Sequence, residues 1–269
     1  MEMKILGPLE LGIGGRNIAP TAPKSRKVLA TLLAEGGRWV PFNALMRELW
    51  DDEPVASAAT TLQTYILGLR RSIAAALQIS PAEVANDILV TCPGGYMFRT
   101  EHGRLDAQLF RSLFTAGRRV WKEGDDVAAI QMLRGALGLW RGQALVDVGH
   151  GPILEARCHE LAEARLYAAE LLIECEIRLG MYREILPELA VLTAENPLHE
   201  GIHAQYMRAL YLDGRRAQAL GVFVRLRTRM VTELGLEPSA PIQQLRQAIL
   251  RADDDDFASS LTAGDPSPS

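Results

Sequence analysis

Residues 60–71 carry hydroxyl, amide and guanidinium side chains at spacings that place them on one side of a helix. The polar side and its flanks hold five such residues: Thr60, Gln63, Thr64, Arg70 and Arg71. Hydroxyl and amide groups form hydrogen bonds with base edges in the DNA major groove, and guanidinium groups bind phosphates. The segment therefore predicts a DNA recognition helix, although an ordinary amphipathic surface helix would have the same periodicity.

The chemistry of each side chain suggests its partner on DNA. An amide can bond bidentately to adenine, and a threonine can offer its hydroxyl group to a base or its methyl group to thymine. We therefore expect Thr60, Gln63 and Thr64 to contact bases. Arg70 and Arg71 are expected to bind phosphates.

The opposite side of the same segment is apolar and predicts the surface that packs on a core. Its residues follow the spacing of a single helical stripe: Leu62, Ile66, Leu69, Ile73 and Leu77. Tyr65 flanks this stripe, and we interpret it as a core residue rather than as a DNA contact.

Further phosphate contacts are expected outside this helix. Lys24, Arg26 and Lys27 lie at the start of a preceding predicted helix, where a phosphate would meet both cations and free N–H groups. The alternative, a solvated helix start, stays open. Arg99 lies on a predicted hairpin and is expected to reach the DNA backbone.

The elements that would position these residues follow in a recognisable order. Short apolar-rich strands are predicted at 3–6, 9–11 and 16–18. Helical periodicity then begins at Lys24, resumes at Phe42–Trp50 and continues through the segment described above. Two further strands, 88–91 and 96–99, flank the turn Cys92-Pro93-Gly94-Gly95. Strands, helices and a hairpin in this order predict a winged helix-turn-helix over residues 1–104, with a small N-terminal sheet.

Beyond residue 104 the pattern is almost purely helical. Amphipathic segments cover Leu105–Trp121, Val127–Trp140 and Ile153–Leu179. Gly180 and Gly214, which are 34 residues apart, each precede a helical pair, and this is the tetratricopeptide period. The fold class is therefore predicted as mainly α, with an all-α tetratricopeptide-like domain over 105–252 that offers a surface to a protein partner. Residues 253–269 are acidic and predicted to be disordered.

Charge and cysteine content narrow the class of protein. The net charge of −4 argues against a protein coated in nucleic acid, but residues 1–104 hold 11 basic and 10 acidic residues, and DNA binding needs only a local basic face. The three cysteines form no C-x-x-C motif, which indicates a reducing compartment. Without a secretory signal or a long apolar run, we expect a cytoplasmic, nucleoid-associated protein.

One motif suggests different chemistry. His199-Glu200-Gly201-Ile202-His203 is a literal H-E-x-x-H, which on a helix would bind zinc with both histidines and use the glutamate as a base. No third ligand follows at a typical spacing, and no Ser-His-Asp or Cys-His arrangement is evident. We therefore expect no enzyme activity, metal or cofactor, and keep a zinc hydrolase as an alternative.

Several fragments together resemble the Streptomyces antibiotic regulatory protein family, in which an OmpR-type winged helix precedes a bacterial transcriptional activation domain. The resemblance covers roughly residues 3–252. The fragments that carry it are Leu6–Leu9, Thr61–Ile66, Leu69–Arg71, Pro93–Tyr96, Leu105–Asp106 with Phe110, Asn196–Glu200, Met207–Tyr211 and Glu233–Pro238. At Leu67-Gly68 this chain departs from other OmpR-type helices, which often carry a basic residue on the groove-facing side.

The resemblance implies a sequence-specific activator of a secondary-metabolite (antibiotic) gene cluster. Family members bind direct repeats near the promoter −35 region and recruit RNA polymerase holoenzyme through its sigma factor and core subunits. A second protomer on tandem repeats is a possible partner. No receiver domain or G-x-x-x-x-G-K-[ST] motif is found, which implies a small, stand-alone member. A tetratricopeptide-like adaptor, or a repressor with the same winged helix, remains the alternative.

Overall fold

A computed structural model describes residues 1–51 and 57–251. The chain divides into two compact units. Unit 1 comprises Met1–Thr115 and Gly135–Leu166, and unit 2 comprises Ala116–Arg134 and Tyr167–Ser269. The predicted disordered tail, 253–269, lies outside the described residues. No helix in the described ranges is long and apolar enough to cross a membrane.

Unit 1 contains two small sheets, and each includes a short strand that the sequence does not predict. In the first, β1 (Glu2–Lys4), β2 (Glu10–Ile13) and β3 (Arg16–Asn17) form an antiparallel meander. β7 (Arg104–Leu105) adds to it in parallel with β1 and gives the order β3-β2-β1-β7. In the second, the predicted hairpin of β5 (Leu89–Cys92) and β6 (Gly95–Phe98) pairs with β4 (Val40–Pro41).

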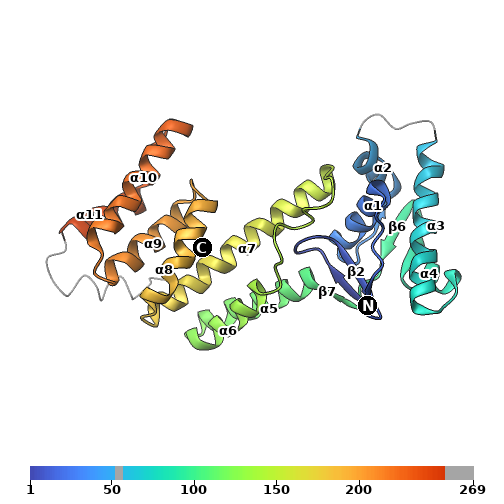
Figure 1. The fold of residues 1–269 in the computed structure, drawn as a ribbon, viewed down its shortest axis with the longest axis horizontal. Helices are drawn as coiled ribbons and strands as arrows, with labels where there is room; N and C mark the ends of the chain where they lie inside the picture. Colours follow the sequence, from blue (N-terminus) through green and yellow to red (C-terminus); the bar gives the residue numbers. More distant parts are fainter. Residues whose placement is uncertain (52–56, 252–269) are drawn as a thin grey trace. The chain divides into compact units, whose positions relative to one another are not determined.

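In the chain, helices α1 (Pro23–Ala34), α2 (Phe42–Trp50) and α3 (Ala58–Leu77) lie between β3 and the β5–β6 hairpin, as predicted, with β4 between α1 and α2. α1 packs against α2, α3 and β6 (Figure 1). The predicted apolar stripe of α3 is buried at Leu62, Ile66, Leu69 and Ile73, and half-buried at Leu77. Burial of this stripe fixes which side of α3 faces outward.

A short helix, α4 (Pro81–Asp87), follows α3 and was not predicted. Its local signal is a capping box: the Ser80 hydroxyl accepts the Glu83 N–H at 3.2 Å, and the Glu83 carboxylate accepts the Ser80 N–H at 2.8 Å. Proline at the first helical position strengthens that signal. The helix leads directly into β5 and so helps to place the hairpin beside α3.

Unit 1 extends past the predicted boundary at residue 104. The carboxylate of Asp106, at the start of α5 (Asp106–Lys122), accepts the N–H groups of Ile5 and Leu6 at 2.9–3.0 Å. The buried Glu48 carboxylate accepts the N–H groups of Gly151 and Ile153 at 2.7 Å, at the start of α7 (Pro152–Arg178). Compact unit 1 therefore joins the winged helix to segments of the helical region, while the assignment of functional domains stays a prediction.

Unit 2 is helical over its described residues. Figure 1 shows its four C-terminal helices as successive hairpins. α8 (Tyr182–Glu195) packs on α9 (Glu200–Leu212), which packs on α10 (Arg216–Leu234) and α11 (Ala240–Arg251). Gly180 and Gly214 adopt φ of 78° and 79° immediately before α8 and α10, a left-handed conformation that favours glycine. The predicted tetratricopeptide-like pairs are confirmed. The remaining helix, α6 (Asp126–Leu137), contributes to both units.

Candidate nucleic-acid interface

The outward face of α3 is exposed and polar. Thr60, Gln63, Thr64 and Arg71 are all exposed, on the side opposite the buried stripe. The Thr64 hydroxyl donates to the Thr60 carbonyl oxygen at 2.9 Å within the helix. Its oxygen lone pairs and its methyl group are therefore what Thr64 can offer to a base. This face has the composition that base readout requires.

Arg70 and Arg71 are neighbours with different surroundings. Arg70 donates from Nε and Nη2 to the Leu89 carbonyl oxygen at 2.9 and 2.7 Å, and from Nη2 to the Thr91 hydroxyl at 2.8 Å. Burial of its guanidinium lowers the pKa of Arg70 from the ordinary value. Arg71 is exposed and forms no ion pair or hydrogen bond with any residue that the structure describes. Arg70 thus links α3 to β5, and Arg71 is free to bind phosphate.

The three cations at the start of α1 also differ in how accessible their charges are. Arg26 donates to the carbonyl oxygens of Leu9 and Pro20 at 2.8 and 3.2 Å and forms an ion pair with Asp147. Its side chain is only 16% exposed, so its charge is already neutralised inside unit 1. This arrangement competes with the phosphate contact that the sequence predicts for Arg26.

Lys24 and Lys27 keep more freedom. The Lys24 ammonium lies 4.6 Å from the centroid of the Trp50 ring, an exposed cation–π contact that leaves its hydrogen-bond donors available. Lys27 donates to the Glu48 carbonyl oxygen at 3.1 Å and is half-buried. Of the cations at this helix start, Lys24 is the one most accessible to a ligand.

The β5–β6 hairpin has the position and the tight turn of a wing. A Cβ atom at Gly95 would lie 2.1 Å from the Val40 carbonyl oxygen, so only glycine allows β4 to pair there. Arg99 follows β6, and its Nη1 donates to the Asn86 carbonyl oxygen at 3.3 Å. Beside the turn, Trp39 remains 46% exposed.

Two exposed residues near this interface were not singled out in the sequence. Trp39 gave no signal, because nothing in its neighbourhood predicts that an indole lies beside the hairpin turn. Arg47, in the last turn of α2, is exposed and has no ion pair with a described residue. Its position in the first helix of a helix-turn-helix was the available signal, since that helix crosses the DNA backbone.

The H-E-x-x-H segment has a structural role at the start of α9. The His199 Nδ1 accepts the Ile202 N–H at 3.3 Å and caps the helix. The Glu200 carboxylate accepts the N–H and hydroxyl groups of Ser239 at 2.7 and 2.6 Å, and His203 bonds to the His199 carbonyl oxygen at 3.0 Å. In the described ranges, no three His, Cys, Asp or Glu side chains are placed to hold a metal ion.

A winged helix with an exposed polar helix face, followed by a helical repeat, defines a two-part transcriptional regulator. Two family models match the chain. The bacterial transcriptional activator domain matches residues 105–250, and the C-terminal part of transcriptional regulatory proteins matches residues 15–98. The chain belongs to the Streptomyces antibiotic regulatory protein family of transcriptional regulators.

Individual relatives agree with this assignment. The regulatory protein DnrI of Streptomyces peucetius is 46% identical over 253 residues, which cover 94% of this chain and 93% of DnrI. The regulatory protein AfsR of Streptomyces coelicolor is 34% identical over 94% of this chain, but the match spans only 24% of AfsR. The solved structure of Mycobacterium tuberculosis EmbR with a low affinity phosphopeptide matches with a TM-score of 0.86 and 31% identity, over 97% of this chain and 68% of that one.

Proposed function

We propose that this chain activates transcription of a secondary-metabolite gene cluster by binding direct repeats near the promoter −35 region and recruiting RNA polymerase holoenzyme. The observation that carries the proposal is the exposed face of α3, where hydroxyl, amide and guanidinium side chains lie opposite the buried stripe. Residues 1–104 would bind DNA, and 105–252 would contact the sigma factor and core subunits.

The predicted DNA contacts fall into two groups, the residues whose polar groups are accessible and the residues that already have structural partners, and the first group holds both base and phosphate contacts. Thr60, Gln63 and Thr64 read bases in the major groove, and each good bidentate contact contributes about 1–3 kcal/mol of base discrimination. Arg71 and Lys24 bind phosphates, since their charges are accessible.

The second group of predicted contacts has structural partners. Arg70 positions β5 and Arg26 is paired with Asp147, so we assign them to holding the interface together. Lys27 and Arg99 each make one backbone contact and approach phosphate only with their remaining donors. A second protomer bound head to tail would double the number of phosphate contacts on tandem repeats.

The test combines binding and transcription on the promoters of neighbouring biosynthetic genes. A gel shift with excess competitor DNA measures binding, and run-off transcription with holoenzyme measures activation. The full-length protein should shift the promoter and raise transcript yield. Gln63→Ala should weaken both effects, whereas Gln131→Ala, at an exposed glutamine on α6, should leave both unchanged.

Each alternative has its own outcome in these assays. A specific shift with lowered transcript yield would make the protein a repressor. No shift at low salt, with the protein folded, would contradict the DNA-reading proposal and favour an adaptor. Elemental analysis that finds bound zinc would reopen the hydrolase alternative.

A further inference from the structure

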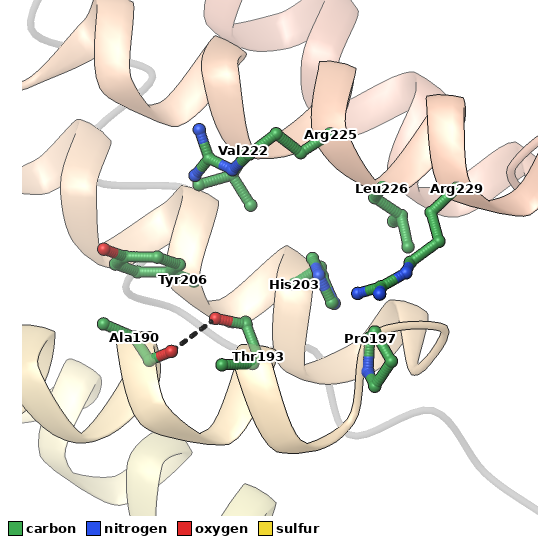
Figure 2. Close-up of a pocket in the computed structure, with 10 residues that line it drawn as sticks. Ala190, Thr193, Pro197, His203, Tyr206, Val222, Arg225, Leu226 and Arg229 are labelled. Carbon is green, nitrogen blue, oxygen red and sulfur yellow. Dashed lines mark hydrogen bonds between the residues drawn. The ribbon is translucent and has the colours of Figure 1, made fainter.

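Unit 2 contains a pocket that the proposed DNA contacts do not use. It has a volume of about 270 Å³ and is lined by residues of α8, α9 and α10 and by Pro197. Figure 2 shows Arg225 and Arg229 extending from α10 toward the pocket, with Arg229 reaching toward His203 and Pro197. Val222 and Leu226 from the same helix supply buried apolar surface.

The charges around the pocket are of one sign. No aspartate or glutamate is among the described residues that line it. Arg229 donates from Nε to Glu233 at 2.8 Å, outside the lining. Arg225 is exposed and forms no ion pair or hydrogen bond within residues 1–51 and 57–251. The charge of Arg225 therefore has no partner among the described residues, whereas that of Arg229 is partly balanced by Glu233, and no acidic side chain of the described ranges lines the pocket itself.

The pocket also contains a buried histidine. His203 is only 6% exposed, and its Nδ1 lies 3.0 Å from the His199 carbonyl oxygen, which assigns the proton of the neutral ring to Nδ1. Its Nε2 has no hydrogen-bond partner among the described residues. Burial lowers the pKa of His203, and the positive charges of Arg225 and Arg229 lower it further.

We propose that this pocket binds a small organic anion. Its carboxylate or phosphate group binds the guanidinium groups of Arg225 and Arg229, which suit planar and tetrahedral oxyanions. A short apolar body lies against Val222 and Leu226. The volume is just below the range of about 300–1,000 Å³ for small-molecule sites, which suits a small ligand and is too little for a helix or a strand of a partner protein. This proposal is independent of the DNA-binding proposal.

The placement of the pocket gives the ligand a mechanical effect. Its lining comes from both predicted helical pairs, because α8 and α9 belong to one and α10 to the next. An anion held by Arg225 and Arg229 of α10 and facing His203 of α9 would tie the two pairs together. Binding would therefore raise the unfolding temperature of unit 2, since a ligand that binds only the native state stabilises it.

The test uses the full chain and four probes: benzoate, phenyl phosphate, and the neutral analogues benzamide and benzyl alcohol. We expect at least one anionic probe to bind and both neutral probes to bind at least about tenfold more weakly, as expected for loss of a charge-assisted contact. Stronger binding of benzoate than of phenyl phosphate would identify a carboxylate ligand, and the reverse would identify a phosphate. Equal binding of neutral and anionic probes would overturn the proposal.

Variants localise the effect. Arg225→Gln and Arg229→Gln should each weaken binding of the anionic probe by about tenfold. Arg227→Gln is the matched control, because Arg227 lies on the same helix, pairs with Glu237 and does not line the pocket. Ala194→Phe, at an exposed position in the lining, should block binding by filling the space.

An independent readout follows from the charge of His203. A bound anion favours the imidazolium form, so the pKa of His203, followed by nuclear magnetic resonance of its ring, should rise on addition of the anionic probe. The charges of His199, Arg225 and Arg229 oppose protonation of this ring, and its hydrogen bond to the His199 carbonyl oxygen favours it. An unchanged His203 pKa in the bound state, or equal binding to the Arg225→Gln and control variants, would overturn the proposal.

Discussion

Replacing Arg70 separates the role of positioning the wing from the role of binding phosphate. The Arg70 guanidinium makes two contacts with the Leu89 carbonyl oxygen, at 2.9 and 2.7 Å, and one with the Thr91 hydroxyl at 2.8 Å. Arg71, one residue further, has no such partner within the described ranges. Arg70→Ala should therefore change stability, and Arg71→Ala should change the electrostatics of DNA binding.

The magnitudes follow from these contacts. A hydrogen bond to a charged group contributes about 1.5–3 kcal/mol, and Arg70 is only partly buried, so Arg70→Ala should lower the free energy of unfolding by about 2 kcal/mol. Arg71→Ala should change it by no more than about 0.5 kcal/mol. Since each phosphate contact contributes about 0.9 to the slope of log K against log salt, Arg71→Ala should flatten that slope by about 0.9.

Urea unfolding followed by circular dichroism measures the first quantity, and anisotropy titrations of a labelled promoter at several salt concentrations measure the second. Arg119→Ala is the control for loss of a positive charge, because Arg119 is 73% exposed on α5 and is not proposed to contact DNA. Arg70→Ala should weaken DNA binding without flattening the salt slope. If it instead keeps full stability and flattens the slope as much as Arg71→Ala, Arg70 binds phosphate and the positioning role is wrong.

Three further predictions follow from the same structure. Gly68→Lys should tighten DNA binding and steepen the slope of log K against log salt by about 0.9. A Cβ at this position meets no atom within 4 Å, and lysine is also a better helix former than glycine. Unchanged affinity and slope in anisotropy titrations would place this position away from the DNA backbone. Glu48→Ala should lower the free energy of unfolding by about 2–5 kcal/mol, since it leaves the buried Gly151 N–H and the half-buried Ile153 N–H without an acceptor. Urea unfolding measures this loss beside Glu83→Ala, the control at an exposed glutamate, and an equal loss in both variants would refute the prediction. The lowered pKa of His203 keeps the folded ring neutral, while the unfolded ring takes up a proton below about pH 6.5. The contribution of His203 to stability is therefore complete above that pH and is lost as the pH falls toward the pKa of the folded state. The protein should lose more stability between about pH 7.5 and 5.5 than the His203→Gln variant loses, and equal losses would contradict the prediction.

The periodicity of α3 made its two faces predictable. An apolar residue every third or fourth position determines which side is buried, so the exposure of Gln63 and Thr64 follows from the same count. The glycines before α8 and α10 were equally informative, because their spacing predicted the helical pairs. These features are local, and local patterns can be read from one sequence.

The partners of the charged side chains could not be predicted in this way. Arg26 meets Asp147, which is 121 residues away, and Glu48 caps a helix that begins more than 100 residues later. A sequence shows a cation or a carboxylate but not the distant backbone that it bonds to. For the same reason β7 was missed, since two residues have no periodicity and become a strand only by pairing with β1.

The central claim, that α3 reads bases, is tested most directly by measuring which base Gln63 recognises. The affinity of the protein and of Gln63→Ala would be measured on promoter sites in which each A·T pair is replaced in turn. The protein should lose about 1–3 kcal/mol at one A·T pair, and Gln63→Ala should be indifferent at that pair while discriminating normally elsewhere. An identical profile of base preference for both proteins would contradict the assignment of α3 as the recognition helix.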